Sequence, residues 1–478
     1  MRFPNEILKV NNYKKMDFLL INLKVKVRLF SLSIFLVVLV ISCKDKSIEE
    51  PTPLASKSIK DYDVNLSIKW ADLTLKLLRT TAAQTPPVAS RVLGYVGLTM
   101  YESGVYGMSD YQSLQGQITW LTTLPKPDLN KKYNWALSVN SAQYQILSDL
   151  FSTTSEANKK TLDSLKSTLE TALINVNNDD TTVVNRSKSF GMSIAKAIWE
   201  YSKTDGGHEA FKNNFPTDYI VPVGIAYWEP TENGRKIPML PYWGRNRTFA
   251  SANGALSVPQ IPKSPSYREA SDFFKEYNEV YQKNKILTQE EKEISVWWAD
   301  DPSETFTPPG HSYSLAKIAV LTSKAKLDQS IEAFAKTGMA VADAFILCWK
   351  TKYTFMNIRP YSYVRQTIDP TWIPFWPAPP FPGFPSGHST QSAASAMALE
   401  SVFGTNFEFI DTSWQGRPKD AKRNVEFKPR KLKSFWAAAE ESAMSRFYGG
   451  IHTNMDNLAG LAEGKKIGVN IVQLKFKK

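Results

Sequence analysis

Residues 384–399 read FPSGHSTQSAASAMAL, and this stretch predicts a tight turn that leads into a helix of small residues. Gly387 allows the backbone to turn closely, and the free N–H groups at the start of the helix point back at the turn. Such a turn can hold an oxyanion. His388 stands at its mouth and can act as an acid or a base near neutral pH. Taken alone, the stretch is equally typical of a capped helix start that carries an incidental histidine.

A second segment, residues 352–360, reads KYTFMNIRP. Lys352 and Arg359 are seven residues apart, which on a helix places them two turns apart on one face. Pro360 is expected to end that helix just past Arg359. A basic pair at this spacing is also common on protein surfaces, so this segment indicates a functional site only in combination with the other two segments.

A third segment, residues 445–456, reads SRFYGGIHTNMD. On one continuous helix Arg446 and His452 would point in different directions, but Gly449 and Gly450 allow a break that lets both aim at one place. His452 and Asp456 are four residues apart and are expected to share a helix face. The carboxylate can then take the proton on one ring nitrogen and leave the other nitrogen basic.

The three segments together predict a site for a highly charged anion. Three cations have no reason to converge without one, and arginine side chains suit tetrahedral oxyanions such as phosphate or vanadate. One histidine could bond to the central atom while the other moves protons.

The ordered motifs K-x6-R-P, P-S-G-H and S-R-x5-H resemble the signature of the vanadium-dependent haloperoxidase and type 2 phosphatidic acid phosphatase superfamily. The resemblance implies vanadate as cofactor, with His452 bonded to vanadium, or phosphate with His452 as nucleophile. It implies that His388 is the acid–base group and that Asp456 supports His452. The residues implied to hold the oxyanion are Lys352, Arg359, Ser386, Gly387 and Arg446.

Aromatic residues near these motifs favour the haloperoxidase branch. Trp349 lies one turn before Lys352, and we expect Trp376, Phe381 and Phe384 to crowd the approach to His388. Trp349 and Phe381 resemble residues that flank the cofactor in bacterial haloperoxidases, although Trp349 could equally be packed in the core. The substrates would be a halide and hydrogen peroxide, and the product a hypohalous species.

Two alternatives to this function stay open at this point. One is a soluble exported acid phosphatase that works through a phospho-histidine, and the other is a non-catalytic surface lipoprotein. The superfamily's lipid phosphatases span membranes repeatedly, whereas residues 43–478 contain no apolar run of that length, and its soluble phosphatases are shorter than this chain. The choice of halide and the organic acceptor are not predicted.

Two other histidines receive weaker interpretations. His311 follows a glycine before a predicted helix, so it either supports the same pocket or belongs to a capped helix start. His208, in the sequence DGGHE, is expected in a surface loop.

The hydrophobic periodicity predicts an all-α helical bundle, and the resemblance implies that this bundle is of the haloperoxidase type. Residues 61–267 form the expected N-terminal helical half, whose last part, residues 205–268, is a long irregular connection rich in glycine, proline and tryptophan. Residues 268–478 form the expected catalytic half. Helices are expected at residues 63–82, 88–107, 131–152, 155–175, 183–203, 268–283, 289–300, 312–324, 327–351, 389–403, 432–447 and 455–474.

The N-terminal residues predict export. Basic residues precede an apolar run at residues 29–42 that is too short to span a bilayer comfortably, and VISC at residues 40–43 resembles a bacterial lipobox. Residues 1–42 would be a lipoprotein signal peptide, with Met1 or Met16 as the start, and residues 43–60 a polar tether. Cys43 would carry lipid and hold the protein to the cell envelope, at the outer membrane, as its only membrane attachment.

Composition excludes several other classes of protein. The 478 residues include only two cysteines and four histidines, which excludes a disulfide scaffold, a cysteine-rich zinc module and an iron–sulfur protein. The net charge of +12 comes without a basic run or stripe, so no nucleic-acid partner is expected. A hydrophobic fraction of 42% is enough for a large core.

Overall fold

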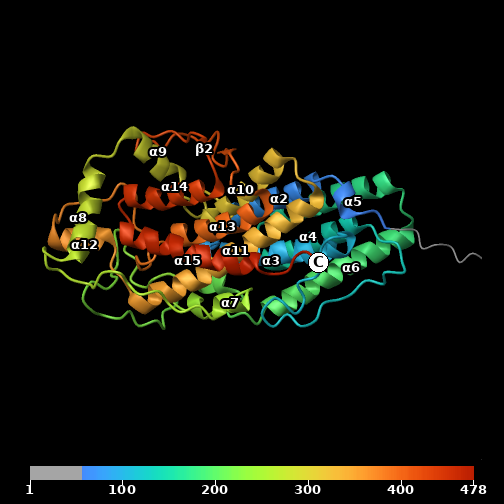
Figure 1. Cartoon of the computed structure of the whole chain (residues 1–478), viewed down its shortest axis with the longest axis horizontal. Helices are drawn as coiled ribbons and strands as arrows, with labels where there is room; N and C mark the ends of the chain where they lie inside the picture. Colours follow the sequence, from blue (N-terminus) through green and yellow to red (C-terminus); the bar gives the residue numbers. More distant parts are fainter. Residues whose placement is uncertain (1–55) are drawn as a thin grey trace, which may run out of the picture. The chain divides into compact units, whose positions relative to one another are not determined.

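Helices make up most of residues 56–478, the part of the chain that this computed structural model describes (Figure 1). The fold is all-α, as the periodicity predicts, and its two short strands, β1 (Phe409–Asp411) and β2 (Arg430–Leu432), pair antiparallel. The N-terminal helices are α2 (Asn65–Thr80), α3 (Pro86–Gly104), α4 (Trp135–Leu150), α5 (Glu156–Asn177) and α6 (Thr181–Ser202). After the connection come α8 (Asp272–Lys285), α9 (Gln289–Trp297), α10 (Thr307–Ser323), α11 (Leu327–Phe355), α12 (Pro360–Thr367), α13 (Gly387–Phe403), α14 (Phe435–Tyr448) and α15 (Asn454–Val472).

The long helix α11 lies between α3 on one side and α13 on the other (Figure 1). Its approach to α3 depends on glycines: a Cβ on Gly97 would lie 2.7 Å from the carbonyl oxygen of Phe334, and one on Gly338 would lie 2.2 Å from that of Leu93. Helices from residues 61–267 and from residues 268–478 therefore share one core. Residues Ala55–Lys478 form one compact unit, and the predicted division near residue 268 stays a prediction.

Residues 203–271, between α6 and α8, form the predicted irregular connection. Besides turns, this stretch holds only two 3-10 helices, Ala210–Asn213 and Trp243–Arg245, and the short helix α7 (Ser251–Gly254). Its backbone is bonded to the segments that follow α11. Met239 N–H donates to Pro380 O at 2.8 Å, and Ala226 O accepts from Ile358 N–H at 2.9 Å. The connection therefore covers the region that carries the sequence motifs.

The end of α11 corrects one prediction. Lys352 and Arg359 do not share a helix face, because α11 ends at Phe355 and Met356 turns into the left-handed region with φ 49°. Arg359 instead caps the start of α12, a helix that was not predicted, with Pro360 in its first turn. Proline suits this first position because its fixed φ is already helical. Eight residues are too few for a clear hydrophobic period.

Cys43, the predicted signal peptide and most of the predicted tether lie outside the described residues. Within residues 56–478, every helix is too short or too polar to cross a membrane.

Candidate active site

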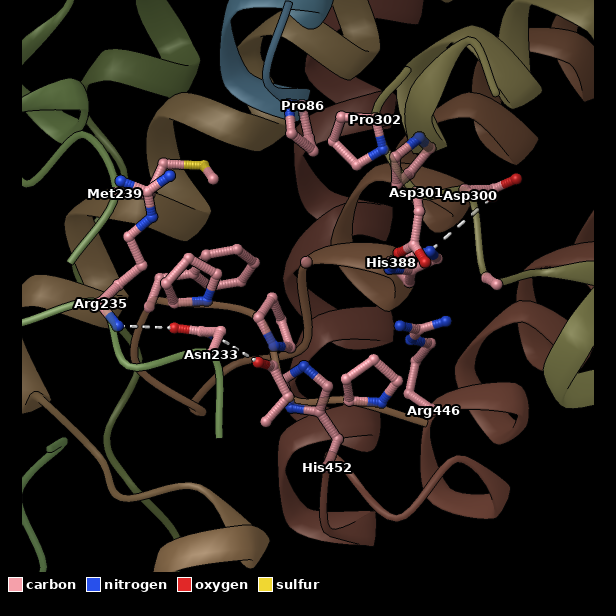
Figure 2. Close-up of a pocket in the computed structure, with 18 of the residues that line it drawn as sticks. Pro86, Asn233, Arg235, Met239, Asp300, Asp301, Pro302, His388, Arg446 and His452 are labelled. Carbon is pink, nitrogen blue, oxygen red and sulfur yellow. Dashed lines mark hydrogen bonds and ion pairs between the residues drawn. The ribbon is translucent and has the colours of Figure 1, made fainter. Parts of the chain in front are cut away.

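A cavity of about 350 Å³ lies where the start of α13 meets the end of α14 and the turn before α15 (Figure 2). Gly387, His388, Arg446 and His452 line it, so the second and third sequence motifs converge as predicted. Gly450, with φ 74°, makes the break after α14 that brings His452 to the cavity. This positive φ is why the chain needs a glycine there.

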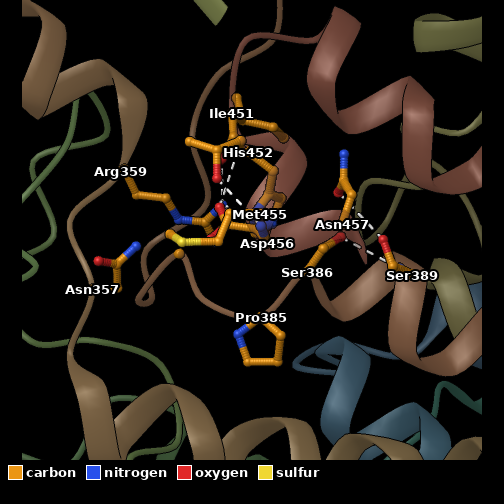
Figure 3. Close-up of polar contacts among 12 residues, drawn as sticks. Asn357, Arg359, Pro385, Ser386, Ser389, Ile451, His452, Met455, Asp456 and Asn457 are labelled. Atoms are coloured by element: carbon orange, nitrogen blue, oxygen red, sulfur yellow. Dashed lines mark hydrogen bonds and ion pairs between the residues drawn. The ribbon is translucent and has the colours of Figure 1, made fainter. Parts of the chain in front are cut away.

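His452 is held by its neighbours on both ring nitrogens (Figure 3). Nδ1 lies 3.0 Å from Asp456 Oδ2, and Nε2 lies 3.0 Å from Arg359 Nη1. Burial, together with the positive charges of Arg359 and Lys352, lowers the pKa of His452 well below its usual range. The imidazole is therefore neutral, with its proton on Nδ1 toward the carboxylate, and its Nε2 electron pair accepts from Arg359 Nη1.

The pairing of His452 with Asp456 was predicted correctly, but for a different reason. The two residues do not share a helix face, because His452 lies before the start of α15. Thr453 caps this helix and forms a capping box with Asp456, whose Oδ2 also accepts from Thr453 N–H at 3.1 Å. The cap turns the carboxylate back toward His452.

Arg359 and Arg446 keep unused donors in the buried site. Arg359 donates from Nε to Phe381 O and from Nη1 to Ile451 O, both at 2.8 Å, and Arg446 donates from Nη1 to Trp298 O at 2.8 Å. Within residues 56–478, Arg359 Nη2 and Arg446 Nε have no hydrogen-bond partner. Burial lowers the pKa of each arginine to about 10, so both stay charged at neutral pH. Buried, charged and unpaired donors fit a bound oxyanion.

Lys352 lies beneath the site and does not line the cavity. Its Nζ donates to the carbonyl oxygens of Pro382, Gly383 and Pro385 at 2.6 to 2.8 Å, which occupies all three of its protons. Burial lowers the pKa of this ammonium group. In this arrangement Lys352 holds the turn that carries Ser386, and its predicted contact with an oxyanion stays a prediction.

Gly387 is the first residue of α13, two residues before the predicted helix start at residue 389, and Ser386 is its N-cap. Ser386 Oγ accepts from Ser389 N–H at 3.3 Å and caps the helix, while Ser386 N–H donates to Asp456 O at 2.9 Å. A Cβ on Gly387 would meet only Trp349 at 3.7 Å and Cys348 at 3.9 Å, which is ordinary contact. Ahead of Ser389, the N–H groups of Gly387 and His388 have no hydrogen-bond partner within residues 56–478 and are free for an anion.

His388 faces a carboxylate that sequence reasoning missed. Its Nε2 lies 3.8 Å from Asp300 Oδ2 and makes no hydrogen bond within residues 56–478. Burial and the charge of Arg446 lower the pKa of His388 well below its usual range. Asp300 is the last residue of the predicted helix 289–300, which in the structure ends at Trp297. Only the acidic pair Asp300–Asp301 before the next predicted helix could have drawn attention to it.

His311 supports Asp300 and is not part of the cavity wall. It lies inside α10, which starts at Thr307, and not at a capped helix start. The fully buried ring bridges two carboxylates, with Nδ1 3.1 Å from Asp300 and Nε2 2.8 Å from Asp411. Burial alone would lower the pKa of His311, but the two carboxylates raise it to about 10. His311 therefore carries a positive charge behind Asp300.

Known proteins resemble this chain along most of its length. The family model described as VCPO second helical-bundle domain matches residues 332–477. A solved bacterial vanadium-dependent iodoperoxidase is 31% identical, with a TM-score of 0.73 over 85% of this chain and 96% of that one. The chain belongs to the vanadium-dependent haloperoxidase superfamily.

Two further members of the superfamily are more distant. The vanadium chloroperoxidase of Curvularia inaequalis is 22% identical over 84% of this chain and 80% of its own length. A bacterial vanadium-dependent chloroperoxidase shares the fold at 16% identity, with a TM-score of 0.62 over 83% of this chain and 93% of that one.

The structure places only some of the aromatic residues of this chain where the sequence predicted them. Trp349 and Phe381 line the cavity with their ring centroids 4.9 Å apart, and Trp349 Nε1 donates to Met239 O at 3.1 Å. Phe384 is instead buried in the core beside Phe355, and Trp376 stacks under Arg423 outside the cavity. In a proline-rich segment without regular structure, closeness in sequence does not fix the direction of a side chain. His208 lies half-buried in the connection against Trp199 and away from the cavity.

Proposed function

We propose that the protein is a vanadate-dependent haloperoxidase, which oxidises a halide with hydrogen peroxide to a hypohalous species. The observation that carries the proposal is the buried group of Arg359, Arg446 and His452, in which unpaired arginine donors lie beside a histidine whose Nε2 contacts only the Arg359 guanidinium. The similar bacterial iodoperoxidase, at 31% identity, supports the same branch of the superfamily.

Vanadate would be held through His452 Nε2, the two arginines and the N–H groups at the start of α13. When bound, it supplies a Lewis-acidic centre that activates hydrogen peroxide for attack by halide. Asp456 keeps the proton of His452 on Nδ1, so that Nε2 presents its electron pair to the bound group. Arg359 and Arg446 offset the negative charge of the oxygens.

His388 is assigned the movement of protons. Because its pKa is lowered, the imidazole is neutral at pH 7 and can accept a proton from hydrogen peroxide. Asp300, 3.8 Å away, would stabilise the resulting imidazolium. Lys352 keeps the turn before His388 in place through its three carbonyl contacts. We also propose that Lys352 polarises the peroxide.

A phosphatase that works through phospho-His452 is the second candidate. The same unpaired arginine donors would fit the oxygens of a phosphate, and Nε2 of His452 could attack its phosphorus. A paired assay of the vanadate-loaded and vanadate-free protein, measuring halide oxidation and phosphoester hydrolysis, separates the two candidates.

Substitution of each histidine tests the assigned roles. His452→Ala should weaken vanadate binding in equilibrium dialysis, because the direct bond to the oxyanion is lost while the arginines remain. His388→Ala should keep vanadate bound and slow halide oxidation by about 10²–10⁴-fold, the usual contribution of a general acid–base. His208→Ala, away from the cavity, is the matched control. Equal vanadate affinities in the two cavity variants would show that the roles are wrongly assigned.

We further propose that the protein is exported and anchored to the outer membrane by a lipid on Cys43, with no other attachment to the membrane. The basic flank, the short apolar run and the sequence VISC support this proposal. Cys43→Ala should block processing or move the protein from membrane to soluble fractions. Mass spectrometry that finds an unmodified Cys43 in the mature chain would contradict it.

A further inference from the structure

The cavity above the oxyanion site is larger than a halide and hydrogen peroxide require. Its volume of about 350 Å³ lies at the lower end of the usual range for small-molecule pockets. Its walls are mostly apolar and come from four separated parts of the chain, namely Pro86, Phe215, the α11 residues Phe345 and Trp349, and the segment Pro377–Phe381. A pocket of this kind suits a small organic molecule with an apolar body.

Polar groups line this cavity at two opposite ends (Figure 2). His388 and Arg446 lie at one end beside Asp300 and Asp301, and His452 lies between the two ends. Arg235 and Asn233, from the long irregular connection, lie at the other. A ligand that fills the cavity would therefore present one end to the reacting group and the other to a guanidinium.

The end of the cavity that carries Arg235 is fixed by side-chain contacts to the neighbouring segment. Asn233 Nδ2 donates to Ala378 O at 3.0 Å, Glu232 Oε1 accepts from Ala378 N–H at 2.6 Å, and Thr231 Oγ1 donates to Ala378 O at 3.2 Å. The Arg235 guanidinium stacks on Phe215, 4.5 Å from the ring centroid. These contacts hold the exposed arginine at the rim of the cavity. Glu232 uses its Oε1 to accept from Ala378 N–H and makes no ion pair with Arg235.

We infer that the cavity binds a small aromatic carboxylate, with its carboxylate on Arg235 and an electron-rich ring carbon facing His388. The protein would then transfer halogen to this bound acceptor instead of releasing all of the hypohalous species into solution. The inference rests on the proposed halide oxidation. In that step the halide gives two electrons to hydrogen peroxide and bonds to one of its oxygens. The other oxygen leaves as hydroxide and takes up one proton from solvent to give water, so that a hypohalous acid remains. The ring carbon then forms its bond to halogen and loses its proton, which leaves with the hydroxyl group as a second water.

Binding can be tested without catalysis. We would titrate 4-hydroxybenzoate into the full-length, vanadate-loaded protein by calorimetry, with no peroxide or halide present, so that the oxyanion site is already occupied. Phenol has the apolar body without the carboxylate, and acetate has the charge without the body. Both should bind more weakly than 4-hydroxybenzoate. Arg235→Gln should weaken binding of 4-hydroxybenzoate about fivefold and leave phenol unchanged, as for a partly exposed ion pair. Lys236→Gln, an exposed neighbour outside the cavity wall, is the matched control.

Catalysis gives a second readout. With bromide and peroxide, an equimolar mixture of 4-hydroxybenzoate and phenol should give more brominated 4-hydroxybenzoate than free hypobromous acid gives, and Arg235→Gln should remove that excess. Equal affinities in wild type and Arg235→Gln, or the product ratio of the free reagent, would overturn the inference. Failure of halide oxidation with binding intact would instead reject the proposed function and leave the carboxylate pocket standing.

Discussion

Single residues of the site depend on charges buried behind them. His311 is positively charged between Asp300 and Asp411, and Trp298 stacks on its ring with centroids 4.4 Å apart. Its pKa rises from about 6.5 in the unfolded chain to about 10 in the fold. A raised folded-state pKa stabilises the protein fully below about pH 6.5, and this contribution is lost as the pH rises through about 10.

His311→Gln should therefore destabilise the protein most in the acidic to neutral range. We expect a loss of about 3 kcal/mol in the free energy of unfolding near pH 6, as for a broken buried ion pair. The difference from wild type should shrink toward pH 10, because the wild-type histidine loses its charge there. Denaturant unfolding across this range measures both proteins, and curves that run parallel from about pH 6 to 10 would contradict the buried charge.

At the scale of elements, the site depends on how closely α15 lies on α13. A stripe of Gly460, Gly464 and Gly468 on α15 faces α13 at the helix contact that joins the His452 turn to the Ser386–His388 turn. A Cβ on Gly464 would lie 2.1 Å from Thr390 O and 2.8 Å from Ala393 Cβ. Because the nearest of these atoms belongs to the backbone, relief requires the two helices to move apart.

Gly464→Ala should lower the free energy of unfolding by about 3 kcal/mol, at the upper end for overpacking. It should also weaken vanadate binding, because α13 and α15 carry the two histidine turns. Leu458→Ala changes an exposed residue of α15 and serves as the control. Thermal unfolding and equilibrium dialysis measure the two effects. A Gly464→Ala protein with wild-type stability would show that the helices are not packed this closely.

At the scale of the whole molecule, the main hydrophobic core of residues 56–478 draws its members from Ile59 to Phe476, and three smaller apolar clusters are separate from it. The chain returns at its end to the N-terminal helices. Tyr101 Oη donates to Phe476 O at 3.0 Å, and the two rings lie 4.8 Å apart edge to face. We therefore expect residues 56–478 to unfold in one transition.

Phe476→Ala should lower the free energy of unfolding by about 3–5 kcal/mol, as for other buried phenylalanines, and should shift this single transition as a whole. The exposed Lys475→Ala is the control. Calorimetry that resolves two transitions, with only one of them affected by Phe476→Ala, would instead favour two separately stable halves.

The sequence alone determined the features that depend on local chemistry. Hydrophobic periodicity located the long helices, because a buried face repeats with the helical turn. The three short motifs predicted the meeting of His388, Arg446 and His452, because a glycine turn, a helix start and a cap are each set by a few neighbouring residues. The eight-residue α12 was missed because a helix of this length is too short to show a hydrophobic period.

Tertiary structure alone decided which distant residues complete the site. Asp300, His311 and Asp411 meet through three separate segments, and Arg235 reaches the cavity from a connection without periodicity. The three donors of Lys352 and the directions of Trp376 and Phe384 likewise depend on how irregular segments pack. No local pattern encodes these contacts, because they arise from filling the space between helices, and the chain that fills it has no repeating geometry of its own.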